Sequence, residues 1–156
     1  MRSKAFVTVI ALCYTSLAVA DNKTEYPKER IAEFVIEKLD ITSLPSAFRP
    51  KKEKDKRTFA DYGFTGHSVG ENAAIVEASS GLRTLAITVL DQKSSGIYVC
   101  VTEPGQNGAD TKMQTVVLLK RNNPNGLLKG RESFREFAAC PLIGESDSTA
   151  DSNGGD

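Results

Sequence analysis

One histidine and a few serines are the residues whose types could support catalysis. His67 could act as a general base, with the carboxylate of Asp61 orienting its imidazole ring. Three serines are available as a nucleophile: Ser68, Ser94 and Ser95. However, adjacent side chains on an extended chain point to opposite sides, so His67 and Ser68 would face away from each other there. A hydrolase built on His67 is therefore an alternative, and a solvent-exposed loop histidine is the favoured interpretation.

Other kinds of site chemistry find little support in the residue spacing. Five carboxylates could in principle converge as an acid and base for glycoside hydrolysis, but nothing selects a pair among Asp61, Glu71, Glu77, Asp91 and Glu103. Gly-rich phosphate loops and Cys-x-x-Cys motifs are absent, and two cysteines with one distant histidine do not form a familiar four-ligand metal site. We expect no cofactor, no metal and no catalytic residue.

The first 20 residues have the pattern of a secretory signal peptide. Arg2 and Lys4 precede a short apolar run, and Ala18 and Ala20 are the small residues expected before a cleavage site. The apolar run is shorter than the roughly 20 residues that a membrane span needs. The sequence therefore predicts an exported protein, periplasmic or secreted, with no membrane span after cleavage.

Two cysteines remain in the chain once the predicted signal peptide, which contains Cys13, is removed. An even number of cysteines in an oxidising compartment is most simply one disulfide, which would join Cys100 to Cys140. The competing interpretation is a pair of buried free thiols.

The chain has no net charge at pH 7, but residues 49–57 contain a run of charged residues with six cations. This segment could bind a polyanion such as nucleic acid, a sulfated glycan or anionic lipid. The first contacts would come from Lys51, Lys52 and Lys54, with additional cations at Arg49, Lys56 and Arg57. Glu53 and Asp55 dilute the charge, and no aromatic residues alternate with the cations for base stacking. A solvated loop is the competing interpretation.

The stretch from Leu82 to Thr102 is predicted to form a hairpin at the centre of the fold. Apolar residues alternate on one face of each run, a pattern typical of strands that cover a core: Leu85, Ile87, Val89, Ile97, Val99 and Val101. A polar turn over 91–96 joins the two runs. This alternation places Cys100 and Tyr98 together on the opposite face of the sheet.

Exposed loops of this hairpin region are the predicted protein-binding sites, because loops held on a rigid sheet often carry binding. The loops are Gln92–Gly96 and Pro104–Asp110, and the candidate contacts are Ser94, Ser95 and Tyr98. The segment Ser95-Gly96-Ile97-Tyr98 resembles the Ser-Gly-x-x-Tyr pattern of bacterial periplasmic lysozyme inhibitors, with the tyrosine one residue earlier. The resemblance implies a binding mode in which a short loop enters the cleft of an enzyme.

The elements that would position these residues indicate an α+β fold. Residues 27–39 have the apolar spacing of an amphipathic surface helix that begins at Pro27 and docks on a sheet. About five mostly antiparallel strands are expected at 58–65, 73–78, 82–90, 97–102 and 113–119, the last of them buried on both faces. Residues 66–72 are expected to be a loop, and 129–140 a short helix or irregular segment.

The predicted organisation is a signal peptide at 1–20, one α+β domain at 21–143 and a disordered acidic tail at 144–156. We expect a small exported, non-catalytic binding protein whose partner is another protein. A periplasmic inhibitor or immunity-type partner of an enzyme is its most specific version. A polyanion-binding module that uses residues 49–57 is the second hypothesis.

Overall fold

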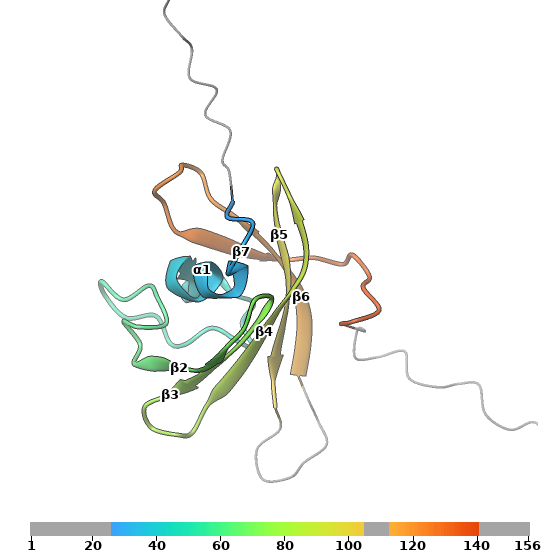
Figure 1. The fold of residues 1–156 in the computed structure, drawn as a ribbon. Helices are drawn as coiled ribbons and strands as arrows, with labels where there is room; N and C mark the ends of the chain where they lie inside the picture. Colours follow the sequence, from blue (N-terminus) through green and yellow to red (C-terminus); the bar gives the residue numbers. More distant parts are fainter. Residues whose placement is uncertain (1–25, 105–112, 141–156) are drawn as a thin grey trace, which may run out of the picture.

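A computed structural model describes residues 26–104 and 113–140 of the chain. The predicted signal peptide, the acidic tail and all of the Pro104–Asp110 loop except Pro104 lie outside the described residues. Figure 1 shows a curved sheet with one helix, α1 (Ile31–Lys38), lying against its concave side.

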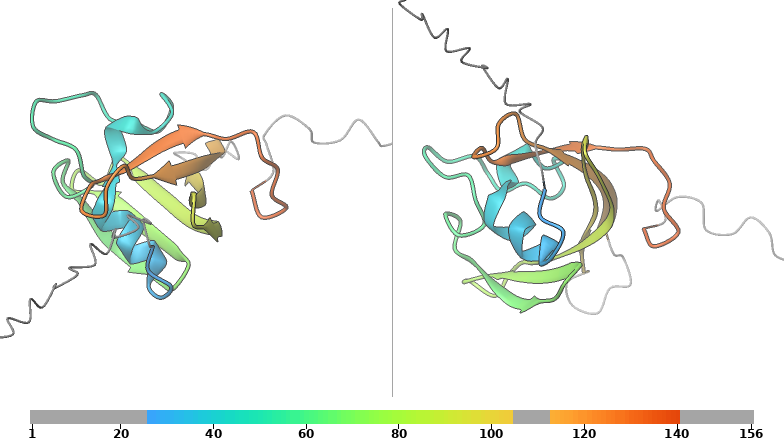
Figure 2. Two further views of the ribbon diagram at one scale, coloured as in Figure 1. Left: turned by 90° about the horizontal axis from the view of Figure 1, so that it is seen from above. Right: turned by 45° about the horizontal axis from the view of Figure 1, so that its top comes forward.

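Within the described residues, seven strands form one sheet in the order β1-β7-β6-β5-β4-β3-β2. The strands are β1 (Leu39–Asp40), β2 (Phe64–Val69), β3 (Ala73–Ala78), β4 (Thr84–Lys93), β5 (Gly96–Glu103), β6 (Met113–Lys120) and β7 (Leu128–Glu132). From β2 to β7 each strand pairs antiparallel with the next, and the two-residue β1 adds a parallel pair with β7. The sheet curls into a half-barrel that partly encloses α1 (Figure 2).

The main core fills the space between α1 and the concave face. Ile31 and Val35 of the helix are buried there, because they lie four residues apart and share one side of the helix. The strands contribute the alternating apolar residues that the sequence predicts to face inward: Leu85, Ile87, Ile97, Val99 and Val101 are buried, and Val89 is partly buried.

The predicted α+β class is wrong, because the protein is mostly sheet. Strands make up 42% and helices 10% of the described residues. The one α-helix has only eight residues and begins at Ile31, not at Pro27, because Arg30 has a left-handed backbone with φ of 51°. The helix ends where Leu39 becomes extended and pairs with Leu128 of β7. The amphipathic pattern correctly predicted a helix. The predicted helix was too long, however, and the share of helix in the fold was overestimated.

Two further differences arise from local contacts. The predicted strand at 58–65 is instead a turn followed by β2, which begins at Phe64 and occupies part of the predicted loop at 66–72. Phe59, at the turn, is buried edge-on against Phe64 with ring centroids 5.4 Å apart. β7 replaces part of the irregular or helical segment predicted at 129–140. By contrast, β3 has the predicted bounds, and Val116 and Val117 confirm that β6 is buried on both faces.

The central hairpin forms as predicted, but with a shorter turn. Lys93 pairs with Gly96, so that only Ser94 and Ser95 connect the strands. A register irregularity between Val89 and Asp91 accommodates one extra residue in β4. As a result Asp91 lies opposite Tyr98, and both belong to the outer, convex face of the sheet.

Candidate protein-binding surface

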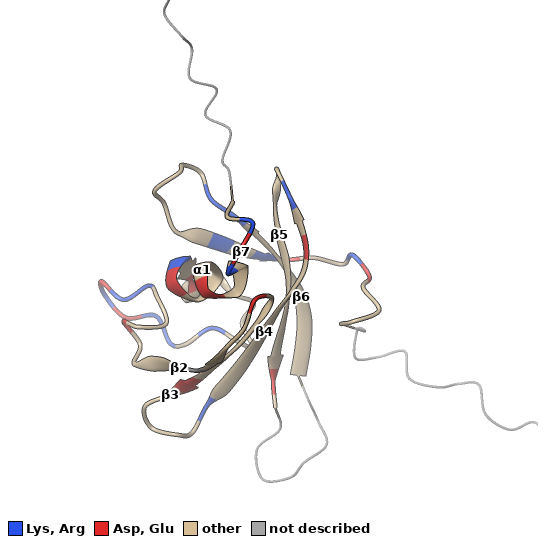
Figure 3. Cartoon of the chain, in the orientation of Figure 1, with Lys and Arg blue, Asp and Glu red and all other residues tan. Residues whose placement is uncertain are grey.

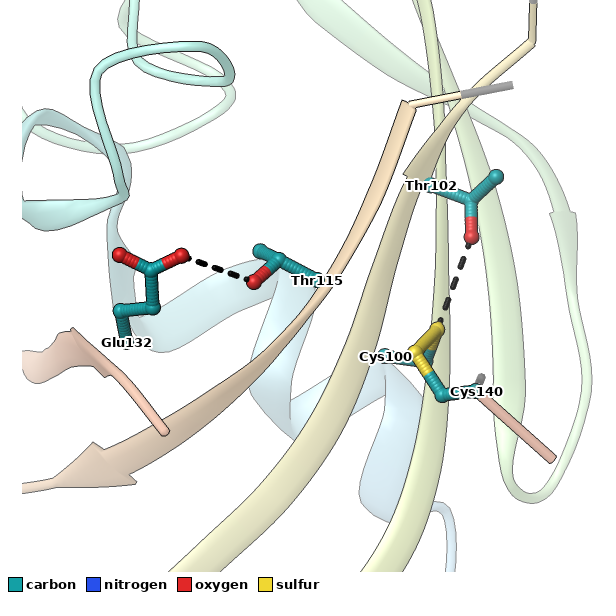
Figure 4. The surroundings of a disulfide bond; sticks show 5 residues. All are labelled: Cys100, Thr102, Thr115, Glu132 and Cys140. Carbon is teal, nitrogen blue, oxygen red and sulfur yellow. Dashed lines mark hydrogen bonds between the residues drawn. A yellow bond between two sulfur atoms is a disulfide. The ribbon is translucent and has the colours of Figure 1, made fainter. Parts of the chain in front are cut away.

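The segment after β7, which we call the strap (residues 133–140), leaves the sheet on its convex side and turns back toward it (Figure 1). A disulfide joins Cys100 of β5 to Cys140 at the end of the strap, which confirms the predicted pairing. Figure 4 shows this bond, with the hydroxyl of Thr102 3.7 Å from the sulfur of Cys100. At the other end, the amide of Ser133 donates to the carbonyl of Val116 over 2.8 Å. The strap is therefore fixed at both ends.

A small second core lies beneath the strap. It consists of Cys100, Val116 and Cys140, with Leu90, Tyr98 and Phe137 packed around it. Leu90 reaches this side at the register irregularity of β4. The outer face of the sheet is thus covered over its centre by the strap, which is why β5 and β6 carry apolar residues on both faces.

Aromatic rings and an arginine side chain form a stack over this second core. The rings of Tyr98 and Phe137 are tilted against each other with centroids 5.5 Å apart, and the guanidinium of Arg135 lies 5.0 Å from each ring centre. The carboxylate of Asp91 lies 3.5 Å from Arg135 and from Lys93. These contacts hold the arginine over the rings. Phe134, one residue before Arg135, is 83% exposed.

Exposed cations surround the stack. The strand register places Lys120 of β6 opposite Lys129 of β7, and Arg131 opposite Leu118. Like charges directly opposite each other in a sheet are unfavourable. Among the residues that the structure describes, Lys120, Lys129 and Arg131 form no ion pair. Figure 3 shows basic residues along β7 and near the tip of β4.

We call this surface the strap face. It combines an aromatic centre with a basic rim and consists of Lys93, Tyr98, Lys120, Lys129, Arg131, Phe134, Arg135 and Phe137. Of the residues predicted from the sequence, Tyr98 lies in its centre, half-buried under Phe137, and Ser94 and Ser95 form the exposed turn beside Lys93. Phe134 and Phe137 were not among the predicted contacts, because residues 129–140 were expected to be a short helix or irregular segment. The polar alternation of Lys129 and Arg131 was a weak signal for β7.

The basic loop lies in another part of the molecule, before the turn that precedes β2. Lys51, Lys52 and Lys54 are exposed, as expected. The loop is nevertheless braced, because the hydroxyl of Tyr62 donates to the carbonyl of Lys51 and accepts from the amide of Glu53.

Two cations at the end of this loop have acidic partners. Lys56 pairs with Glu53 at 2.8 Å, and the hydrogen bond that the Lys56 ammonium donates to the Glu53 carboxylate raises the pKa of the ammonium. Arg57 lies 3.7 Å from the buried carboxylate of Asp40. The dilution of charge expected from Glu53 therefore acts on Lys56.

Two residues of the hydrolase alternative, His67 and Ser68, are neighbours in strand β2, whereas Asp61, Ser94 and Ser95 lie in turns. The sequence Gly66-His67-Ser68-Val69-Gly70 has the Gly-x-Ser-x-Gly spacing, but it runs along β2 and leads to β3. It does not form the turn between a strand and a helix that presents a nucleophilic serine in many hydrolases. His67 is in strand β2 at a register irregularity between Gly66 and Ser68, so the prediction of a loop position is wrong. The carboxylate of Asp61 accepts hydrogen bonds from the amides of Arg57 and Thr58, at 2.9 and 2.8 Å. Asp61 thus closes its own turn. A hydrolase that uses His67 stays a prediction, and it requires that His67→Ala abolish the activity.

The hydrogen bonds to Asp61 give a testable pH dependence. Donation by the amides of Thr58 and Arg57 lowers the pKa of the Asp61 carboxyl below its ordinary value near 3.8. A group with a lowered pKa in the folded state contributes stability above its unfolded value and loses it as pH falls through the folded one. We expect the amide NMR signals of Arg57 and Thr58 to stay unchanged at pH 5 and to shift only below 3.8. The Asp61→Asn variant should show no such shift of these amide signals. In the unmodified protein, a titration midpoint at or above pH 3.8 would contradict a lowered pKa of Asp61.

Residues 26–104 and 113–140 contain no cluster of three or more His, Cys, Asp or Glu side chains suited to a metal ion. In the same residues, no helix has the length and apolar character needed to cross a bilayer.

No family model, no curated protein and no solved structure matches this chain.

Proposed function

We propose that this is a small exported, non-catalytic binding protein, and that its strap face contacts an acidic surface on a partner protein. The observation that carries the proposal is Phe134, which is 83% exposed beside the stack of Tyr98, Arg135 and Phe137. Phe134 adjoins the stack through its sequence neighbour Arg135, and exposed apolar residues that gather in one patch mark interaction sites more often than isolated ones do.

The composition of the strap face favours a protein partner. Tyrosine, phenylalanine and arginine are enriched in protein interfaces, and tyrosine and arginine are among the residues that most often carry the binding energy. The disulfide and the ring stacking order Arg135 and Phe137 before any partner arrives. Binding therefore costs less conformational entropy than it would with a free segment.

The basic rim favours a partner with an acidic surface. Lys120, Lys129 and Arg131 have no carboxylate partner among the described residues, so carboxylates on another protein would relieve the repulsion between the paired lysines. Because the rim is exposed, salt should slow association more than it speeds dissociation.

The most specific version of the proposal is an inhibitor or immunity-type partner of an enzyme in the periplasm. The exposed turn of Ser94 and Ser95 at the margin of the strap face supports it, because such a turn can reach the rim of an enzyme's cleft. The disulfide is compatible with an oxidising compartment, as export would require.

Affinity capture from the exported fraction of the source organism, with the exported chain as bait, tests this function. We expect one acidic protein to bind stoichiometrically, and Phe134→Ala to weaken its binding at least about tenfold, as truncation of a central aromatic contact does. Calorimetry with the purified partner would give the dissociation constants.

The matched control is Leu82→Ala, which removes another exposed apolar side chain, 72% exposed, between β3 and β4. It should bind as the unmodified protein does. An unchanged affinity in Phe134→Ala, with circular dichroism showing the native fold, would refute the proposed surface. Equal loss in both variants would also refute it.

A further inference from the structure

A second surface with a different chemistry lies beside the basic loop. The chain forms a hollow of about 450 Å³ whose lining combines cations, hydroxyls and a proline: Thr42, Ser46, Arg49, Pro50, Lys51 and Lys52. The size falls within the range of pockets that take small ligands or single units of a larger one.

The cations of this hollow differ from those at the end of the same loop. Lys56 and Arg57 have carboxylates nearby, whereas Arg49, Lys51 and Lys52 form no ion pair within the described part of the chain. Three positive charges therefore converge on one concave surface without acidic partners, and an anion placed there would be favoured.

The geometry of the hollow is held by contacts on both sides. Phe48, just before Arg49, is buried in the core, and the amide of Arg49 donates to the carbonyl of Pro45. On the other side, the hydroxyl of Tyr62 bridges the backbone of Lys51 and Glu53. The backbone that carries the three cations is thus fixed, which lowers the entropy cost of binding a ligand.

We propose that this hollow binds a sulfated polysaccharide. One sulfate ester would lie between Arg49, Lys51 and Lys52, with the hydroxyl of the exposed Ser46 available to a sugar hydroxyl. This site is separate from the strap face, and the proposal does not depend on the proposed protein partner.

The lining favours a sulfated sugar over a nucleic acid. Single-stranded nucleic acids are held by aromatic rings that stack on bases, in addition to cations. The hollow has no aromatic residue in its lining. The ring of nearby Tyr62 has the ammonium of Lys56 over it at 5.5 Å, and its hydroxyl is occupied by the loop backbone. A sulfate ester needs only the charges and hydrogen-bond donors that are present.

Titration of the full chain with heparin oligosaccharides tests the proposal. The triple variant Arg49→Gln, Lys51→Gln, Lys52→Gln should bind about 30-fold or more weakly, since each charge contact near 4 Å is worth several-fold even in water. The control triple variant Lys28→Gln, Arg30→Gln, Lys38→Gln loses the same number of positive charges from α1 and the residues before it, outside both surfaces, and should change the affinity less than about threefold. Affinity should also fall with rising salt.

Three outcomes would overturn the proposal. Equal losses in the two triple variants would mean that only net charge matters. Equal binding of desulfated heparin would exclude sulfate as the recognised group. Equal or tighter binding of single-stranded DNA of the same charge would identify a nucleic-acid site. None of these outcomes depends on whether a protein binds the strap face.

Discussion

The double variant Cys100→Ala, Cys140→Ala is expected to lose about 4 kcal/mol of unfolding free energy. In the chain-entropy model, a bond between residues 40 apart in sequence reduces the freedom of the unfolded chain by this amount. The loss is a large part of the 5–15 kcal/mol that typically stabilises a domain. Urea denaturation monitored by circular dichroism would measure it.

The double cysteine variant should also affect partner binding, in addition to the unfolding free energy. Both cysteines are buried with Val116, so that without the bond the strap loses its covalent attachment above the second core. We expect partner binding to weaken even though Phe134 is still present, because the segment that carries it is no longer ordered. Adding a reductant to the unmodified protein should reproduce the stability loss, and the same reductant should leave the double variant unchanged. A stability loss under about 1 kcal/mol would contradict this account.

Gly96→Ala is expected to lower the unfolding free energy by about 3 kcal/mol, from backbone strain and a steric clash. Gly96 has a φ of +154°, which side chains rarely adopt. A Cβ at this position would lie 2.7 Å from the carbonyl oxygen of Leu119 and 2.8 Å from a methyl group of Leu118. The backbone of β6 would have to move away from β5 at the end of the central hairpin.

Gly70→Ala is a suitable control for this variant. A Cβ at Gly70 would meet its nearest atom, the carbonyl oxygen of Ala73, at an ordinary 3.5 Å. We expect this change to alter stability by less than about 0.5 kcal/mol, as most surface substitutions do. Thermal unfolding of both variants would measure the two changes in stability. Similar losses of stability in Gly96→Ala and Gly70→Ala would contradict the expected clash at Gly96.

The parts of the fold that could be predicted are those whose signal is local in sequence. Alternation of apolar residues identified the central hairpin, a continuous apolar run identified β6, and two remaining cysteines identified the disulfide. The bounds of β3 were also predicted correctly. β7 was missed because Leu128 is its only apolar residue of any size, and β1 because it consists of two residues that pair with a strand about 90 positions later. The fold class was therefore misjudged.

The strap face was harder to predict than the fold, because its residues come from distant parts of the sequence. Tyr98 was a predicted contact, but its ring neighbours, Arg135 and Phe137, come almost 40 residues later and meet it only because the strap crosses β5. The opposition of Lys120 and Lys129 follows from the register between β6 and β7, which no local pattern revealed. The cations of the basic loop were found directly, because they are consecutive in sequence.

The two edge strands of the curled sheet, β1 and β2, limit how easily another chain can pair with it at high protein concentration. An open sheet exposes unpaired backbone amides and carbonyls along its outermost strands, and these can recruit another chain. Here one outermost strand, β1, has only two residues, and the other, β2, is interrupted by an irregularity between Gly66 and Ser68. Neither offers a long regular template. Edge-to-edge growth into fibrils is therefore disfavoured by the architecture, although the half-barrel is not closed.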